Sequence, residues 1–138
     1  MWRSPEGQLG KGVGKASDVF SFALLCLYVT TRAQCFYLDY EKLDIEPGLV
    51  ILCKLLSVFG PLPEALVEHG NDEEAGALLR GLWQAIEEDG PREPFEHWSE
   101  EMFPDLDHEA KRLISSMADL DPAKRALMSD IVTDPYWN

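Results

Sequence analysis

The strongest constraint in this sequence is the eleven-residue run Val19–Val29, in which only Ser21 is polar. Ser17 and Asp18 precede it and are good N-cap residues, so we expect a helix that begins there and continues to about Val29. A helix that is apolar on every side cannot lie on a surface and must be enclosed by other elements. The run is too short to cross a bilayer, which needs about 20 residues. The fold is therefore predicted to be built around one buried helix.

The other periodic segments also predict helices, and no segment alternates as a β-strand does. An all-α fold is expected. Its further helices are Leu49–Phe59, Pro63–His69, a helix from Asn71 or Asp72 to Gly90 that buries Leu78, Leu79, Leu82, Trp83 and Ile86, a helix capped by Asp107, and Leu127–Val132. The segment 91–104 is expected to be irregular and anchored by Phe95, Trp98 and Phe103.

Charge is distributed unevenly along the 138 residues, whose formal net charge is −13. Residues 41–110 carry 18 acidic and 4 basic side chains, whereas both ends of the chain are nearly neutral. This acidity argues against a nucleic-acid partner. A run of acidic residues is usually a solvated face; a weaker hypothesis is that it selects basic protein partners or substrates.

Cysteine and histidine spacing excludes several kinds of site. Cys26, Cys35 and Cys53 are odd in number and form no C-x-x-C pair, so neither a disulfide framework nor a zinc site is indicated. Cys26 and Cys53 lie in apolar runs and are expected to be small core residues. The three histidines show no ligand spacing, and no metal site is expected. No signal peptide is recognisable, so the chain is expected to be intracellular, in the cytoplasm or the nucleus, with no membrane partner.

Three short motifs, in order along the chain, resemble the second half of a eukaryotic Ser/Thr protein kinase domain. Trp2-Arg3-Ser4-Pro5-Glu6 resembles the A-P-E motif that closes the activation segment, with Ser4 in place of Ala. The segment from Ser17 to Ala23 resembles the D-x-W-S-x-G start of the central large-lobe helix, with Phe20 in place of Trp and Ala23 in place of Gly. Asp121-Pro122-Ala123-Lys124-Arg125 resembles the D-P-x-x-R turn near the domain's end, and 134–137 the H-P-x-W that often follows it. The resemblance is strongest to fungal kinase-like proteins, and it includes the segment Phe59-Gly60-Pro61-Leu62-Pro63.

The resemblance covers residues 1–138 and implies part of a kinase domain, the helical large lobe from the end of the activation segment onward. It implies a buried ion pair between Glu6 and Arg125, which are 119 residues apart in the chain; two unrelated surface charges are the alternative. It implies that Asp18 braces the catalytic loop, in addition to capping its own helix. It implies that Trp2, Arg3, Ser4 and Pro5 belong to the loop on which a protein substrate docks, although packing beneath the lobe accounts equally well for Trp2.

The chain lacks the parts that transfer a phosphoryl group. No H-R-D-x-x-x-x-N and no D-F-G occurs in it, and the glycine-rich segment 10–15 departs from the P-loop pattern at Leu9 and Ala16. No catalytic residue is therefore assigned, and no cofactor is expected in this chain, whereas a full-length kinase would use ATP and Mg²⁺. The isolated chain is expected to be inactive.

Two accounts fit these observations, and a third is more remote. The chain is either the tail of a complete Ser/Thr kinase or a stand-alone, non-catalytic helical module that binds protein partners. An unrelated helical scaffold would be favoured if Glu6 and Arg125 were far apart. Because the kinase lobe encloses its central helix from both sides of the A-P-E motif, part of the Val19–Val29 surface is expected to be exposed here. Self-association through that apolar surface is therefore predicted.

Overall fold

The computed structural model describes residues 3–10, 14–32, 47–69, 72–89 and 94–137, which are largely helical. Within these ranges there is no β-strand, so the predicted all-α class is confirmed. The α-helices are α1 (Pro5–Gln8), α2 (Lys15–Thr31), α3 (Pro47–Phe59), α4 (Glu64–Glu68), α5 (Glu73–Glu88), α6 (His108–Met117) and α7 (Met128–Val132). Single 3-10 turns occur at η3 (Phe95–His97), η4 (Pro122–Lys124) and η5 (Pro135–Trp137).

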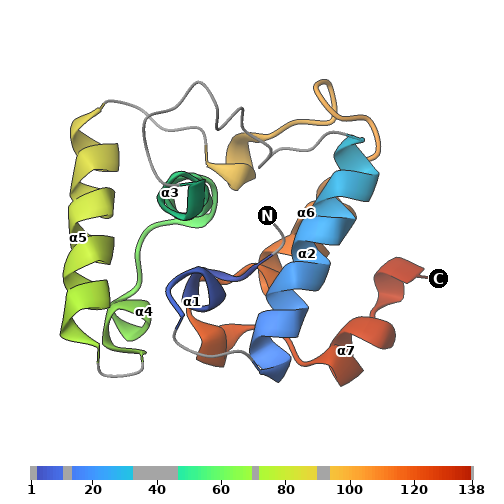
Figure 1. Cartoon of the computed structure of the whole chain (residues 1–138). Coiled ribbons are helices and arrows are strands. Elements are labelled where there is room, and N and C mark those ends of the chain that lie inside the picture. The colour runs from blue at the N-terminus through green and yellow to red at the C-terminus, as the bar shows by residue number, and fades with distance from the viewer. Residues whose placement is uncertain (1–2, 11–13, 33–46, 70–71, 90–93, 138) are drawn as a thin grey trace.

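The helices form two groups that share one core. In Figure 1, α3, α4 and α5 lie on one side, α2, α6 and α7 lie on the other, and α1 sits between them. α2 packs along α6, α5 packs against α3 and α4, and α1 contacts α3. A continuous cluster of buried apolar side chains joins the two groups; it includes Phe20, Leu24, Leu27, Leu52, Leu55, Leu56, Leu66, Leu79, Leu113, Ile114 and Met117.

Only one face of α2 is enclosed. Val19, Phe20, Ala23, Leu24 and Leu27 are buried, as predicted for a central helix. The opposite face is exposed at Leu25, Tyr28 and Val29, which are 46%, 38% and 62% accessible. Enclosure on every side was therefore an overestimate, and the predicted partial exposure of this helix is confirmed. Across the described ranges, none of the helices has the length and hydrophobicity of a bilayer-spanning segment.

The start of α2 differs from the prediction. The helix begins at Lys15, and Asp18 lies within its first turn rather than at the N-cap. Gly14 is the N-cap, in an extended conformation, and its N–H donates to the Ser17 hydroxyl at 3.3 Å. Lys15 and Ala16 are good helix formers, so the helix extends three residues further back than the serine and aspartate indicated. Asp18 still favours the helix through its position near the positive N-terminal end.

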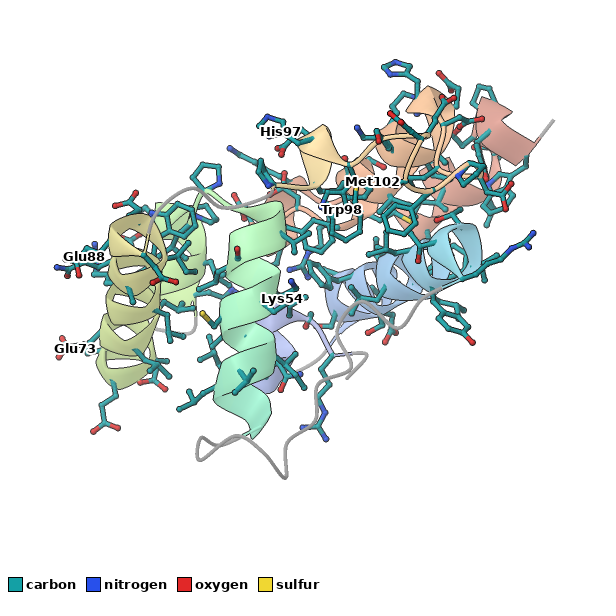
Figure 2. All side chains as sticks on the ribbon, turned by 90° about the horizontal axis from the view of Figure 1, so that it is seen from above. Lys54, Glu73, Glu88, His97, Trp98 and Met102 are labelled. Atoms are coloured by element: carbon teal, nitrogen blue, oxygen red, sulfur yellow. The ribbon has the colours of Figure 1, made fainter. Side chains whose placement is uncertain are left out.

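The long helix α5 is amphipathic, and of the two expected starts, Asn71 and Asp72, the structure has Asp72 as the N-cap. The Asp72 carboxylate accepts from the Ala75 N–H at 3.1 Å. Leu79 is buried, and Leu82, Trp83 and Ile86 pack against the core, but Leu78 is 37% exposed and was wrongly predicted to be buried. Successive residues of an α-helix are about 100° apart around its axis, so Leu78 points away from the core when its neighbour Leu79 points into it. Figure 2 shows the acidic ends of this helix, Glu73 and Glu88, on the side away from α3.

A chain of aromatic contacts anchors the irregular segment before α6. Phe20 of α2 contacts Phe59 of α3 with ring centroids 5.8 Å apart, and Phe59 contacts Phe95 at 5.6 Å. Trp98 continues the chain, at 5.4 Å from Phe95 and 5.7 Å from Phe103. In Figure 2, Trp98 points toward the interior and its neighbour His97 points outward. The predicted anchoring role of Phe95, Trp98 and Phe103 is thus confirmed.

Replacement of Asp107 by alanine is expected to lower the free energy of unfolding by about 1 kcal/mol, the usual loss for an aspartate N-cap. Its carboxylate accepts from the Ala110 N–H at 2.8 Å and so satisfies one free donor at the start of α6. The matched control is Asp105→Ala, two residues earlier, where an exposed carboxylate lies 3.4 Å from Arg32. Urea titrations followed by circular dichroism should show the larger loss for Asp107; equal losses would contradict the capping role.

Candidate functional site

The first element of the site is the short helix α1. Ser4 is its N-cap, with an extended backbone, and its hydroxyl accepts from the Gly7 N–H at 3.1 Å. Pro5 follows at the first helical position, where its missing N–H costs nothing. Ser4, Pro5 and Glu6 are all buried. This local geometry directs the Glu6 carboxylate into the protein.

The second element is Arg125, which follows the turn η4. Asp121 caps that turn, because its carboxylate accepts from the Ala123 N–H at 2.9 Å. Beyond the turn, the Arg125 Nη1 donates to Glu6 Oε2 at 2.7 Å, and the two side chains are only 1% and 3% exposed. The ion pair that the kinase resemblance implied is therefore present, and the alternative of two unrelated surface charges is wrong.

Arg125 connects more of the molecule than this one pair. Its Nη1 also donates to the Ala16 carbonyl at 3.0 Å, and its Nε donates to the Asp119 carbonyl at 2.7 Å. The guanidinium carbon lies 4.7 Å from the centroid of the Phe20 ring, in a cation–π contact. One side chain thus ties together α1, the start of α2 and the segment that leaves α6. These contacts offset part of the cost of burying two charges.

The other residues predicted for the site do not join this pair. Trp2 lies outside the described residues. Arg3 is exposed, whereas Ser4 and Pro5 are used to build α1, so a role in docking substrate stays a prediction for this loop. Asp18 is exposed in the first turn of α2 and does not form the cap expected of it. Its proposed bracing of a catalytic loop also stays a prediction.

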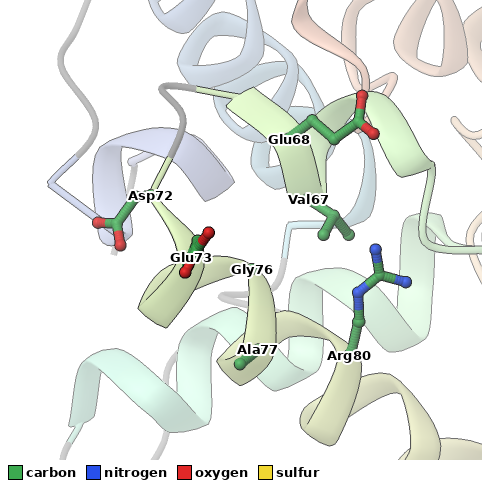
Figure 3. Close-up of a pocket in the computed structure, with 7 residues that line it drawn as sticks. All are labelled: Val67, Glu68, Asp72, Glu73, Gly76, Ala77 and Arg80. Carbon is green, nitrogen blue, oxygen red and sulfur yellow. The ribbon is translucent and has the colours of Figure 1, made fainter.

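A cavity of about 510 Å³ lies between α4 and α5. Figure 3 shows its polar lining, with Glu68, Asp72 and Glu73 around an opening that Arg80 also reaches. The guanidinium of Arg80 is paired with Glu64, and Asp72 is used as the N-cap of α5. These side chains have structural partners or face solvent, and they form no arrangement suited to proton transfer or nucleophilic attack.

An apolar groove of about 220 Å³ runs between α2, α6 and η5. Phe22, Leu25 and Val29 line one side and Trp137 lines the other. The sequence predicted exposed apolar surface on α2 but not this groove, because the second wall depends on where η5 packs. The available signal was the spacing of apolar residues at 22, 25, 26 and 29, which places them on one helix face.

The second wall is fixed by charged groups near the C-terminus. The Arg112 guanidinium donates to both carboxylate oxygens of Asp134, at 3.1 and 2.6 Å, and also contacts Glu109. This bidentate pairing, with a hydrogen bond from the Tyr136 N–H, lowers the pKa of Asp134. The pair therefore stabilises the folded state at pH values above the ordinary aspartate pKa. This stabilisation is lost as the pH falls through the lowered pKa that Asp134 has in the folded protein. Burial, with nearby Asp107 and Asp105, raises the pKa of Tyr136.

The two described cysteines are partly buried, and burial raises the pKa of both thiols. A raised pKa keeps them protonated and weakly nucleophilic at neutral pH. Among the residues with described positions, no three His, Cys, Asp or Glu side chains are grouped so as to hold a metal ion.

No protein-family model matches the chain, and no curated protein matches it by sequence. The buried ion pair and the fold are therefore the structural observations on which a function can be argued.

Proposed function

We propose that the chain is a large-lobe segment of a eukaryotic Ser/Thr protein kinase domain. One observation carries the proposal: Glu6 in the A-P-E-like motif meets Arg125 in the D-P-x-x-R-like turn, fully buried and 2.7 Å apart. An ion pair between residues so distant in sequence does not arise from local helix geometry, and its two partners lie in the two motifs whose resemblance implied it. The all-helical fold is compatible with that lobe.

In such a kinase, this segment would position a protein substrate rather than carry out the chemistry. Arg125 holds α1 and the start of α2 at fixed positions through Glu6 and the Ala16 carbonyl. The residues directly before α1, including the exposed Arg3, would then be presented at a defined place beside a catalytic loop supplied by a longer chain. The phosphoryl transfer itself would need ATP, Mg²⁺ and the motifs that are missing here.

The proposal is tested by the DNA that precedes the Met1 codon. An upstream reading frame in phase with this one should encode a Gly-rich loop, H-R-D and D-F-G in that order. The longer protein, once expressed, should bind Mg²⁺–ATP and phosphorylate serine or threonine in a protein substrate, whereas the present chain should do neither. An upstream region of stop codons or unrelated sequence would remove the kinase proposal.

The second candidate function is a non-catalytic helical module that binds proteins. The observation that favours it is the exposed apolar face of α2 beside the α2–α6–η5 groove, since such surfaces mark interaction sites. Stop codons upstream, together with a stable fold for the chain alone, would favour this candidate. The separation of Glu6 from Arg125 that would have favoured an unrelated helical scaffold is not found, because the two side chains are in contact.

A further inference from the structure

The outer face of α2 carries a regular line of five residues: Asp18, Phe22, Leu25, Val29 and Arg32. They are separated by steps of four and three, the spacing with which one helix presents a continuous seam to another. Arg32 is the C-cap of the helix, directly after its last residue. Asp18, Leu25, Val29 and Arg32 are exposed and Phe22 is partly buried. We call this line of five the α2 seam.

The α2 seam is apolar in the middle and charged at both ends, with opposite signs. An acidic side chain stands at position 18 and a basic one at position 32, and Leu25 lies midway between them. In an antiparallel pair of such helices, centred on Leu25, the acid of each seam faces the base of the other. A parallel pair would place like charges together, which is unfavourable. The charge pattern therefore complements a second copy of itself in one orientation.

The apolar middle of the seam opens onto the α2–α6–η5 groove. Leu25 and Val29 form one edge of this groove, and the half-exposed Trp137 stands across it. Apolar side chains of an antiparallel helix would enter the groove and cover this surface. Arg32 is also free to turn toward a new carboxylate, because its contact with Asp105 is long, at 3.4 Å, and both side chains are exposed.

We propose that the α2 seam is a homodimer interface, in which two copies pair antiparallel about a twofold axis at Leu25. A twofold contact uses the same surface on both copies, so that surface must be complementary to itself. The α2 seam is self-complementary, because its acidic end faces the basic end of the second copy. Two crossing helices bury less than the roughly 800 Å² per partner of a stable complex, so the dimer is weak and depends on concentration. The inference concerns the outer face of this chain and does not rest on the kinase proposal.

The test is a charge exchange, followed by sedimentation equilibrium of the chain from about 10 to about 500 μM, a range suited to a weak dimer. Wild-type protein should show a monomer–dimer equilibrium. The single variants Asp18→Arg and Arg32→Asp each place like charges together and should raise the dissociation constant about tenfold or more. The double variant restores both opposite-charge pairs and should dimerise like the wild type. Both sites are exposed, and aspartate tolerates the left-handed conformation of residue 32 (φ 56°).

A second pair of variants tests the centre of the seam. Leu25→Glu should abolish the dimer, because it places two carboxylates together on the twofold axis. Leu78→Glu changes a comparably exposed leucine on α5 and should leave the dimer intact. Circular dichroism reports whether each variant is folded. The proposal would be overturned if the wild-type protein stayed monomeric at every concentration. It would also be overturned if the single variants and Leu25→Glu left the dimer unchanged, or if the double variant failed to restore dimerisation.

Discussion

Replacement of Arg125 by methionine is expected to lower the free energy of unfolding by about 3–5 kcal/mol, as found when one partner of a buried ion pair is removed. Methionine preserves much of the packing against Phe20 but donates no hydrogen bond. It would leave the Glu6 carboxylate charged and buried, and the Ala16 and Asp119 carbonyls would lose their contacts with the guanidinium. Urea denaturation followed by far-UV circular dichroism would measure the loss.

Three comparison variants separate the effect of leaving a buried charge unpaired from the effect of losing an arginine side chain. Arg80→Met removes an arginine that pairs with Glu64 on the surface, where both side chains are more than half exposed, and should cost less than about 1 kcal/mol. Glu6→Gln keeps an oxygen that can accept from Arg125 and should cost less than Arg125→Met. The double variant Glu6→Leu with Arg125→Met removes both charges and should recover part of the stability. Equal losses for Arg125→Met and Arg80→Met would contradict the view that Arg125 holds α1 in place.

Local signals in the sequence predicted much of the helical structure. Asp107 was predicted as an N-cap, and Asp72 was one of two expected starts of α5, with Asn71; both aspartates accept a backbone N–H three residues later. The start of α2 was misplaced because a serine and an aspartate also occur inside a first turn, where the cap here is Gly14. Sequence patterns distinguish a cap from a first-turn acid poorly, since both positions favour the same small polar or acidic residues.

Tertiary contacts were predictable only where a motif linked distant residues. The partnership of Glu6 with Arg125 followed from two motifs, and their contact is present. The further acceptors of Arg125 are the carbonyls of Ala16 and Asp119, and a backbone carbonyl leaves no signature in the sequence. The groove beside α2 was missed for a similar reason. Its far wall depends on the packing of η5, which the pairing of Arg112 with Asp134 holds in place.

Replacement of Gly60 by alanine is expected to lower the free energy of unfolding by about 3 kcal/mol, the upper range for overpacking a core. Gly60 follows α3 directly, and its N–H donates to the Leu56 carbonyl at 2.8 Å. A Cβ at this position would lie 2.5 Å from that carbonyl oxygen and 2.6 Å from an atom of the Trp83 ring. The carbonyl belongs to the backbone of α3 and the ring packs against the core, so neither can move without breaking other contacts.

The matched control is Gly81→Ala, in the middle of α5, where a Cβ would meet no heavy atom within 4 Å. Alanine there restricts the unfolded chain and favours the helix, so this variant should gain about 0.5–1 kcal/mol. The same chemical change thus has opposite signs at two sites in the same protein. Thermal unfolding midpoints would show this directly, and a Gly60→Ala midpoint at or above the wild-type value would contradict the close packing of α5 on the end of α3.

A double variant separates the two groups that a methyl group at position 60 would meet. Gly60→Ala combined with Trp83→Leu removes the indole ring but leaves the Leu56 carbonyl in the way of the new methyl group. This double variant should therefore recover only part of the stability that Gly60→Ala loses.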